Sequence, residues 1–583
     1  MAKKNDLIYG INGPIIKVKN TDSFFMYEMV HVGDGLVGEV IKINKEFTTI
    51  QIYEDATGLT TRDKVVGMKK PMGVLLGPGL IGNIFDGIER SLGAIKDIHG
   101  DFIPGGCRID ISNNENLWNV KILVKVGDEV SYGMIFATCA ETSVVEHRFL
   151  IPLGVEGKVI SIAERKEFKL TDTVIEVKNK DKVVGLNLLQ FWPIRQSRPV
   201  KKRHSPNKPL ITGQRVIDTL FPMAKGGCAM LPGGFGAGKT VTQHQLAKWC
   251  NVDVVIYVGC GERGNEMTQI LEEFGELIDP KTGKSMLERT IFIANTSNMP
   301  VSAREASIYT GVTLAEYYRD MGYDVVMLAD STSRWAEALR EISGRLEEIP
   351  AEEGYPAYLS SRLAEFYERA GNFTSFSDRE SSITLIGAVS PQGSDFSEPV
   401  TQNSKRFTRC FWALDKSLAY IRHYPTINWR LSYSEYVKEL EPWFELNIGE
   451  EFVENRKKIV YILEEEAKLL EITKLVGQDI MADDQKLVLE TAKLIRIGFL
   501  QQNIFNDFDK FVSLEKQRLM MSVILYLYKK SKELITNLVP MSKIIQLDIF
   551  QEISKMKYNM PADCLEKFKS YIELIDQKLD SIV

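Results

Sequence analysis

The eight residues from Gly233 to Thr240 constrain the fold of this chain more than any other stretch. They read Gly-Gly-Phe-Gly-Ala-Gly-Lys-Thr and match G-x-x-x-x-G-K-[ST], the pattern of a loop whose backbone N–H groups surround phosphate oxygens. An apolar run from Cys228 to Leu231 precedes this loop, and a helix-forming stretch from Val241 to Trp249 follows it. A strand, loop and helix in that order aim a helix N-terminus at an anion. The sequence therefore predicts an α/β sheet with a nucleotide site beside one strand.

The residues of this loop are expected to share the binding of ATP or ADP. Lys239 is the candidate catalytic cation, because its ammonium would neutralise the β- and γ-phosphates, and Thr240 is the candidate Mg²⁺ ligand. The residues expected to contact the nucleotide from this loop are Gly233, Gly234, Phe235, Gly236, Ala237, Gly238, Lys239, Thr240 and Val241. A glycine-rich turn without a ligand is the weaker alternative, since both flanking elements are present.

Buried apolar runs alternate with helical segments between about 195 and 435, as in a parallel sheet that is covered on both faces. The predicted strands are 227–231, 253–259, 289–295, 324–330, 382–389 and 410–414. The carboxyl ends of such strands face the ligand crevice. Polar residues that directly follow these strands are therefore the candidates for catalysis.

Two acidic residues occupy such positions. Asp330 ends the strand 324–330 and is the candidate carboxylate for Mg²⁺, with a helix N-cap as the alternative role. Glu262 follows the strand 253–259 and is the candidate group that polarises the attacking water. Arg263 is expected to hold phosphate charge or to position Glu262. Without their place in the sheet, Glu262 and Arg263 would be interpreted as a surface ion pair.

Sequence patterns outside this region indicate further domains. Residues 1–75 alternate polar and apolar residues between turn residues, which predicts an N-terminal β-barrel. Residues 110–190 form a second β-rich stretch, with turn residues between short strands. Residues 436–583 are rich in charged, helix-forming sequence and predict a helical C-terminal domain. A multidomain chain agrees with the length of 583 residues.

Composition narrows the classes of partner. The chain has 72 Lys and Arg residues against 78 Asp and Glu, so it lacks the positive field that attracts nucleic acid. The basic run Lys201–His204 is interpreted as a solvated linker, and no nucleic-acid partner is expected. Seven scattered cysteines without a Cys-x-x-Cys pair indicate buried free thiols. The N-terminal residues do not resemble a secretory signal, and the apolar stretch Leu519–Tyr528 is shorter than the roughly 20 residues of a membrane span.

Several longer strings resemble those of the catalytic A subunit of V-type and archaeal-type rotary ATPases. They are Gly213 with Val216–Asp218 and Lys225–Gly227, then Gly261–Met267, Ala329–Ala338, Asp395–Asn403 and Pro425–Trp429. The likeness runs from the N-terminal barrel to at least residue 505. It implies a RecA-like nucleotide-binding domain that hydrolyses ATP, or synthesises it in reverse, and couples this reaction through rotation to the transport of H⁺ or Na⁺.

The same resemblance implies partners and a location. It implies a hexamer of alternating A and B subunits, with ATP sites at the A–B interfaces and an arginine finger supplied by B. Central and peripheral stalk subunits and a membrane ion-translocating sector complete the expected complex. The chain is therefore expected to be peripheral, at the cytoplasmic face of a membrane. The inserted domain at 110–190 is also implied, because A subunits carry one there.

Three residues have an implied role at the base of the nucleotide. By the resemblance, Tyr424 and Phe505 would flank the adenine ring, with Gln502 as a further nucleotide contact. From the residues alone, both rings would be interpreted as part of the core. The two aromatic residues therefore have two alternative roles, contact with adenine or packing in the core.

The chain departs from the family pattern in several places. Gly234 stands where proline is usual, and Ala237 stands where serine or cysteine is usual, which excludes a cysteine-based redox lock within the loop. Tyr424 stands where phenylalanine is usual, and the stretch Ser390–Ser394 replaces a version richer in proline and glycine. These changes predict a nucleotide affinity that differs from that of close relatives.

Other classes of protein share parts of this pattern. A secretion-system ATPase and an RNA translocase are also RecA-like hexameric motors. The first would lack the insertion at 110–190, and the second should show a basic, aromatic binding surface. A non-catalytic nucleotide-binding subunit should have lost Lys239 or Glu262, and both are present.

Overall fold

The computed structural model describes residues 6–19, 23–113, 115–180, 182–476, 481–559 and 567–582. The chain divides into two compact units. The first, called the carboxylate unit because it contains Glu262 and Asp330, comprises residues 1–205, 226–228 and 252–408. The second, called the P-loop unit, comprises residues 206–225, 229–251 and 409–583.

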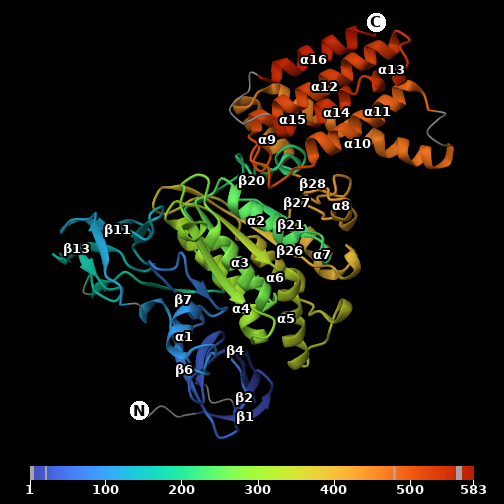
Figure 1. Ribbon diagram of the computed structural model, residues 1–583. Helices are drawn as coiled ribbons and strands as arrows, with labels where there is room; N and C mark the ends of the chain where they lie inside the picture. Colours follow the sequence, from blue (N-terminus) through green and yellow to red (C-terminus); the bar gives the residue numbers. More distant parts are fainter. Residues whose placement is uncertain are drawn as a thin grey trace. The chain divides into compact units, whose positions relative to one another are not determined.

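The N-terminal part of the carboxylate unit is a closed six-stranded barrel, drawn in dark blue in Figure 1. Its strands are β1 (Asp6–Asn12), β2 (Ile15–Lys19), β3 (Glu28–Val32), β4 (Leu36–Ile43), β5 (Phe47–Ile52) and β6 (Lys64–Pro71). The order around the barrel is β1-β2-β5-β4-β3-β6. Ile16, Val30, Val40 and Ile50 are fully buried inside it. The predicted N-terminal β-barrel is therefore confirmed, and buried and exposed residues alternate most clearly along β1 and β2.

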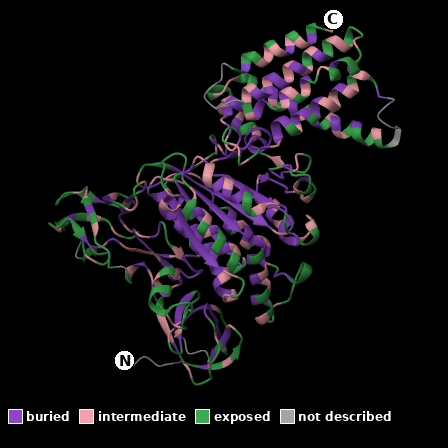
Figure 2. Cartoon of the chain, viewed as in Figure 1, coloured by how far each residue is buried: buried purple, intermediate pink, exposed green. Residues whose placement is uncertain are grey.

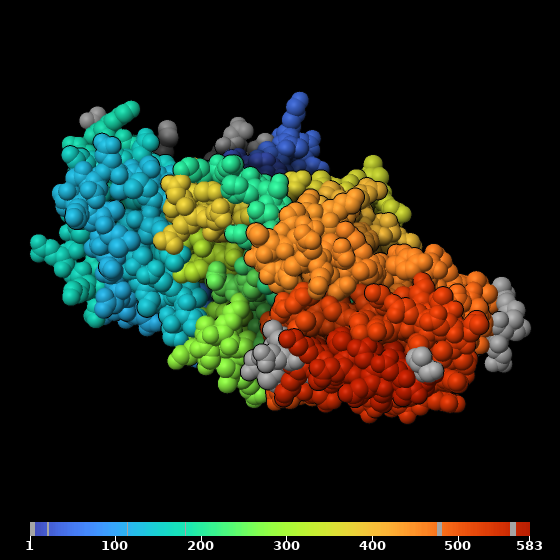
Figure 3. Space-filling view, turned by 90° about the horizontal axis from the view of Figure 1, so that it is seen from above, coloured from blue at the N-terminus to red at the C-terminus, as the bar shows by residue number. Residues whose placement is uncertain are grey.

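The second β-rich region consists of two four-stranded antiparallel sheets, with orders β10-β13-β15-β16 and β12-β11-β9-β14. Its strands are β9 (Trp118–Ile122), β10 (Glu129–Val130), β11 (Ile135–Ala140), β12 (Glu146–Leu150), β13 (Gly157–Ile162), β14 (Glu167–Phe168), β15 (Ile175–Asn179) and β16 (Lys182–Leu186). Figure 3 shows the region as a lobe of cyan atoms. The strands β7 (Gly73–Leu76) and β17 (Gln190–Pro193), which lie before and after the region in the chain, pair with each other. Both ends of the insertion therefore lie side by side.

A buried carboxylate fastens this region to the rest of the carboxylate unit. Glu141 accepts hydrogen bonds from the backbone N–H groups of Gly79, Leu80 and Ile81 at 2.9, 3.1 and 3.2 Å. Its other oxygen lies 2.7 Å from His147 Nδ1. These contacts lower the pKa of Glu141 although burial alone would raise it.

The main sheet of the carboxylate unit has the order β26-β24-β22-β23-β8, and all of these neighbours are parallel. Its strands are β8 (Ile84–Phe85), β22 (Val254–Cys260), β23 (Thr290–Asn295), β24 (Asp324–Asp330) and β26 (Glu380–Val389). Figure 2 shows these strands almost wholly in the colour of buried residues. The helices of this part are α1 (Leu92–His99), α3 (Gly264–Glu276), α4 (Val301–Asp320), α5 (Thr332–Arg345), α6 (Leu359–Tyr367) and α7 (Pro399–Lys405).

The basic run Lys201–His204 is largely exposed to solvent, as predicted, but it is not a linker. Lys202–His204 form strand β18, which pairs with β25 (Gly371–Thr374), and β25 pairs in turn with β26. Arg203 donates a hydrogen bond of 2.6 Å to the carbonyl of Ala370. The basic side chains therefore belong to an edge strand of the sheet.

The P-loop unit contributes a smaller set of strands. Strand β21 (Cys228–Pro232) runs parallel to β27 (Cys410–Phe411), and β28 (Tyr433–Ser434) is antiparallel to β27. Helix α2 (Lys239–Trp249) follows β21, and a short pair, β19 (Pro209–Leu210) with β20 (Met223–Ala224), precedes it. All six strands predicted between 227 and 414 therefore exist, although the last is shortened to two residues.

The C-terminal part of the P-loop unit is helical, as predicted, and is drawn in orange and red in Figure 1. Its helices are α8 (Lys416–Tyr420), α9 (Val437–Asn447), α10 (Glu450–Val476), α11 (Asp483–Leu494), α12 (Leu514–Thr536), α13 (Met541–Gln546), α14 (Ile549–Ser554), α15 (Met556–Asn559) and α16 (Phe568–Asp580). Within the described ranges, no helix combines the length and apolar character needed to cross a membrane. The cysteines that the structure describes are all free, and all but Cys107 are buried, while Cys564 lies outside the described residues.

Candidate active site

The phosphate-binding loop lies between β21 and α2, in the setting that the sequence predicts. Gly236 and Gly238 have φ angles of 77° and 89°, a region that L-residues with side chains rarely adopt. Gly238 is the N-cap of α2, so Lys239 opens the helix and Thr240 lies in its first turn. The helix N-terminus and the Lys239 ammonium thus supply positive charge at one place.

Neighbouring residues hold this loop from beneath. Thr426, which is fully buried, donates its hydroxyl hydrogen to the carbonyl of Ala237. A Cβ atom on Gly233 would lie 2.8 Å from Leu414 Cβ, so only glycine fits there. Thr426 belongs to the string Pro425–Trp429, but its role as a support of the loop was missed by the sequence analysis.

The outer side of the loop is exposed. The ring of Phe235 is 78% exposed and Val241 is 46% exposed, while Lys239 is half-buried. The loop therefore exposes Phe235 and Gly236, while Gly233, Gly234 and Ala237 are buried within the chain.

The two aromatic residues assigned to the adenine ring are exposed and do not belong to the core. Phe505 is 91% exposed and Tyr424 is 41% exposed. Their segments are joined, because Gln502 N donates to Tyr424 O at 2.7 Å and Gln501 Nε2 donates to Arg422 O at 3.1 Å. Exposed aromatic rings on two linked segments favour the role as a base-binding pair over the core role.

Gln502 is placed differently from these rings. It is buried, its Oε1 accepts a hydrogen bond from Arg215 N at 3.0 Å, and its Nε2 donates to Gly213 O at 2.8 Å. The side-chain amide thus holds residues 213–215 and 502 together. The Gln502 amide retains one hydrogen and one lone pair for a contact with a nucleotide.

Asp330 and Glu262 lie at the carboxyl ends of neighbouring parallel strands. Gly259 of β22 is in register with Asp330 of β24, and Glu262 follows β22 by two residues. Asp330 is 3% exposed, and Tyr257 donates its hydroxyl hydrogen to Asp330 Oδ2 at 3.2 Å. Burial, followed by the Asp330 carboxylate, raises the pKa of Tyr257 well above its ordinary value. The N-cap of α5 is Ser331, so Asp330 does not have the alternative role of N-cap.

The segment with Glu262 is fixed through its backbone. Gly261 N donates to Asn295 O at 2.7 Å, and Ser297 N donates to Glu262 O at 2.9 Å, so the loops after β22 and β23 are linked. Glu262 is half-buried. The Arg263 side chain is 66% exposed and lies 3.8 Å from Glu266. The backbone is thus ordered while the Arg263 guanidinium stays open to solvent.

Two arginines beside this segment were missed by the sequence analysis. A Cβ atom on Gly261 would lie 2.8 Å from Arg334 Cβ and 3.1 Å from Arg304 Cδ. The pKa of Arg334 is raised, chiefly by its hydrogen bond to Glu337, and Glu262 adds to the effect. Arg334 lies in the string Ala329–Ala338, which was the available signal. No pattern in the sequence indicated Arg304.

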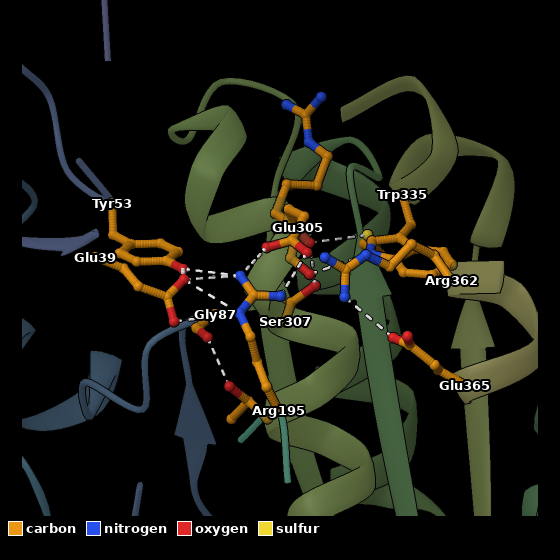
Figure 4. Close-up of polar contacts among 12 residues, drawn as sticks. Glu39, Tyr53, Gly87, Arg195, Glu305, Ser307, Trp335, Arg362 and Glu365 are labelled. Carbon is orange, nitrogen blue, oxygen red and sulfur yellow. Dashed lines mark hydrogen bonds and ion pairs between the residues drawn. The ribbon is translucent and has the colours of Figure 1, made fainter. Parts of the chain in front are cut away.

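A buried ionic network holds the helices that carry these arginines (Figure 4). Arg195 donates to both oxygens of Glu305 in α4, at 3.0 and 2.9 Å, and to Glu39 of the barrel at 2.9 Å. Tyr53 donates to Glu39 at 2.6 Å, and Trp335 Nε1 of α5 donates to the Glu305 carbonyl at 3.1 Å. Removing one member of such a buried network costs about 3–5 kcal/mol, because its partner charges stay buried. The barrel, α4 and α5 are therefore held as one piece near Glu262.

The donor set proposed for Mg²⁺ suits that ion. Thr240 offers a hydroxyl oxygen and Asp330 a carboxylate, and Mg²⁺ prefers oxygen ligands from one or two protein groups together with phosphate and water. Among the residues that the structure describes, no group of three or more His, Cys, Asp or Glu side chains is placed to hold a metal by itself. Each of these two residues thus offers an oxygen ligand of the kind that Mg²⁺ prefers.

Comparisons with known proteins agree with this arrangement. The chain matches four family models: the ATP synthase alpha/beta family nucleotide-binding domain at 213–434, the C-terminal domain of V and A type ATP synthase at 441–545, the alpha/beta subunit barrel-sandwich domain at 110–195 and the alpha/beta family beta-barrel domain at 8–69.

Curated relatives match over nearly their whole length. The chain is 53% identical to a V-type ATP synthase alpha chain of Halothermothrix orenii, over 99% of this chain and 98% of the relative. It is 50% identical to the A subunit of the A-type ATP synthase of Methanopyrus kandleri over the same shares. Among solved structures, the ATPase EscN of the type III secretion system of enteropathogenic E. coli has a TM-score of 0.64 at 19% identity, over 89% of this chain and 100% of that one. That last likeness concerns the fold alone.

Proposed function

The chain belongs to the family of catalytic alpha or A subunits of V-type and A-type ATP synthases, and on this basis we propose that it hydrolyses or synthesises ATP within a rotary ATPase that transports H⁺ or Na⁺. The observation that carries the proposal is the complete phosphate-binding loop, with Lys239 at the N-terminus of α2 and Thr426 beneath the loop. The fold and this loop together support a nucleoside triphosphate or diphosphate as substrate.

Each residue at the site has a proposed role. Lys239 neutralises charge on the β- and γ-phosphates as the bond breaks, and the N–H groups of residues 233–241 hold the phosphate oxygens. Glu262 polarises the attacking water, and Arg263 holds phosphate charge. Thr240 and Asp330 would be the ligands of Mg²⁺, which would supply positive charge to the phosphates.

The base of the nucleotide is proposed to lie between Tyr424 and Phe505. Their exposure and the hydrogen bonds that link their segments support this role. A flat aromatic ring gains favourable stacking with adenine on either face. Gln502 is proposed to contribute by holding Phe505 in place.

The partners proposed are those of the family resemblance. They are a B-type subunit in an alternating hexamer with ATP sites at its interfaces, central and peripheral stalk subunits, and a membrane ion-translocating sector. The chain would then be peripheral at the cytoplasmic face of the membrane. The proposal includes four domains: an N-terminal barrel at 1–75, a nucleotide-binding domain at 76–435, the β-rich domain inserted into it at 110–190, and a helical domain at 436–583.

A secretion-system ATPase is the main alternative. The similarity to EscN supports a shared fold at 19% identity, whereas the relatives at 50–53% identity are ATP synthase subunits over nearly their full length. The match of residues 441–545 to the C-terminal domain of V and A type ATP synthase also favours the rotary enzyme.

Purification through a tag on this chain from detergent-solubilised native membranes tests the proposal. We expect a second nucleotide-binding chain, stalk subunits and membrane subunits in fixed ratio, together with ATP hydrolysis. Recovery with components of a protein-export apparatus, or a homohexamer of this chain with full activity, would overturn it.

A further inference from the structure

Three buried cations lie beneath the segment that carries Phe505. Arg215 and Lys516 are 0% exposed and Lys557 is 1% exposed. All three donate hydrogen bonds to the backbone of residues 497–508. One of these cations, Arg215, forms an ion pair with the carboxylate of Asp509.

Arg215 holds the middle of this segment. Its Nη2 donates to Gln501 O at 2.8 Å, its Nε donates to Phe499 O, and its Nη1 pairs with Asp509. Asp509 in turn accepts a hydrogen bond from Asn503 N at 2.7 Å. The backbone on both sides of Gln502 is therefore tied to one buried ion pair.

Lys557 reaches the same segment from the C-terminal helices. It lies in α15, and its Nζ donates to Ile497 O at 2.6 Å and to Gln501 O at 2.9 Å. Ile497 belongs to the short helix Ile495–Leu500, whose last carbonyls need partners outside the helix. Lys557 satisfies these groups with a charge-assisted donor at the helix C-terminus.

Burial of this ammonium is costly. Desolvation, with a smaller contribution from the Arg215 charge, lowers the pKa of Lys557 from 10.5 to about 8. An apolar side chain of the same length would avoid this cost. Packing alone therefore does not explain a lysine at this position. Its hydrogen bonds to the carbonyls of Ile497 and Gln501, which fix where these groups lie, explain it better.

Phe505 depends on such placement, because its own ring makes little contact with the protein. It is 91% exposed, and its N–H donates to Asn503 Oδ1 at 3.0 Å within the same turn. Gln501 is the point where the anchors meet: its carbonyl accepts from Arg215 and Lys557, and its side chain donates to Arg422 O beside Tyr424.

We propose that Lys557 is a positioning residue for the base of the nucleotide: by holding Gln501 it keeps Phe505 opposite Tyr424. The C-terminal helices would then set the affinity for ATP through one side chain. This inference rests on the proposed function in one respect, the contact between Phe505 and adenine.

Steady-state hydrolysis by the assembled complex carrying Lys557→Met tests the proposal. We expect KM for ATP to rise about three- to tenfold and kcat to stay within about twofold, because uniform binding energy is lost and the chemical step is untouched. Inhibition by inorganic tripolyphosphate, which has phosphates and no base, should be unchanged. Lys557→Gln keeps one donor group and should give an intermediate KM.

Lys555→Met is the matched control, since Lys555 is exposed and lies two residues earlier in the chain. Its KM should equal that of the wild type. A Lys557→Met complex with unchanged KM, or one in which tripolyphosphate inhibition weakens as much as ATP binding, would overturn the proposal.

Phe505→Ala separates this inference from the proposed function. If Phe505→Ala leaves KM unchanged, the contact with adenine is wrong. If Phe505→Ala raises KM and Lys557→Met does not, the contact stands and the positioning role of Lys557 is wrong. Thermal unfolding of each variant checks that the complex is folded.

Discussion

The P-loop unit and the carboxylate unit hold their functional groups in opposite ways. In the P-loop unit two aromatic residues proposed to contact ATP are exposed, Phe235 at 78% and Phe505 at 91%. In the carboxylate unit Asp330 is 3% exposed, and the segment of Glu262 lies beside helices held by the buried Arg195 network. The first unit exposes two aromatic side chains, whereas the second buries Asp330 and holds the Glu262 segment through its backbone.

This difference follows from the work proposed for each unit. Groups that bind a ligand must remain accessible, so buried anchors such as Thr426 and Arg215 hold only their backbone. A carboxylate that acts on a metal must be placed in advance, because reorganisation at the moment of reaction costs rate. We therefore expect changes at Phe505 and its supports to alter mainly nucleotide binding, and changes at Glu262 to alter mainly the chemical step.

Lys239→Ala gives the largest expected effect. The loop presents this one ammonium to the phosphates, so we expect hydrolysis to fall by about 10³-fold or more and ATP binding to weaken with it. ATP turnover and equilibrium binding by the assembled complex measure both. Lys248→Ala, at the other end of α2, is the control and should retain most activity. Near-normal turnover in Lys239→Ala would refute the assignment of the loop.

Glu262→Gln should separate binding from chemistry. The amide keeps the shape of the carboxylate but does not polarise water as a base, so we expect about a 10²- to 10⁴-fold loss of kcat. The affinity for a non-hydrolysable ATP analogue should stay within about threefold of the wild type. Equal losses of affinity and rate would break the comparison between the two units and make Glu262 a structural residue.

Much of this fold could be predicted from the sequence because its strands are distinctive. The parallel strands are buried on both faces, so β22 and β24 appear as apolar runs. The placement of Asp330 and Glu262 followed from the rule that ligands bind at the carboxyl ends of such strands. The run at 201–204 was misinterpreted because basic residues on an edge strand have the same composition as a linker.

The supports of the site could not be predicted in this way. Arg215, Lys516 and Lys557 are buried cations far apart in the sequence, and helical charged residues are usually exposed. Their pairing with backbone carbonyls depends on tertiary structure and leaves no local pattern. The exposure of Phe505 likewise depends on which neighbours the fold provides, so only the family resemblance indicated its role.

Tyr257→Phe tests how Asp330 is held in the carboxylate unit, and its expected effect on nucleotide binding is smaller. Loss of the hydroxyl removes one hydrogen bond to Asp330, so we expect the Mg²⁺ concentration for half-maximal ATP binding to rise about three- to tenfold. Titration of nucleotide binding with Mg²⁺ measures this shift. Tyr309→Phe is the control, because within the described residues the buried Tyr309 hydroxyl makes no hydrogen bond. The same shift in both variants would exclude a specific role for Tyr257.

The smallest expected effect is a pH dependence that originates in the P-loop unit. Burial lowers the pKa of Lys557 to about 8, so its ammonium loses a proton in the folded chain as the pH rises above that value. The neutral amine donates weaker hydrogen bonds to Ile497 O and Gln501 O, and KM for ATP should rise about two- to threefold between pH 7 and 9. The charged and titratable groups around it are Arg215, Asp509, Tyr558 and His423.

Stability should change in the other direction over the same range. The charged form of Lys557 costs folding free energy at neutral pH, and this cost declines as the pH rises from about 8 towards 10.5, where the unfolded chain also loses the proton. KM and the midpoint of thermal unfolding are therefore measured together from pH 7 to 9 in the wild type and in Lys557→Met. The variant should lose the rise in KM and part of the gain in stability, while Lys516, whose pKa is also about 8, keeps the remainder of that gain. If KM rises equally in both proteins, another group causes the pH dependence of KM. The segment that carries Phe505 is then not controlled by the charge of Lys557.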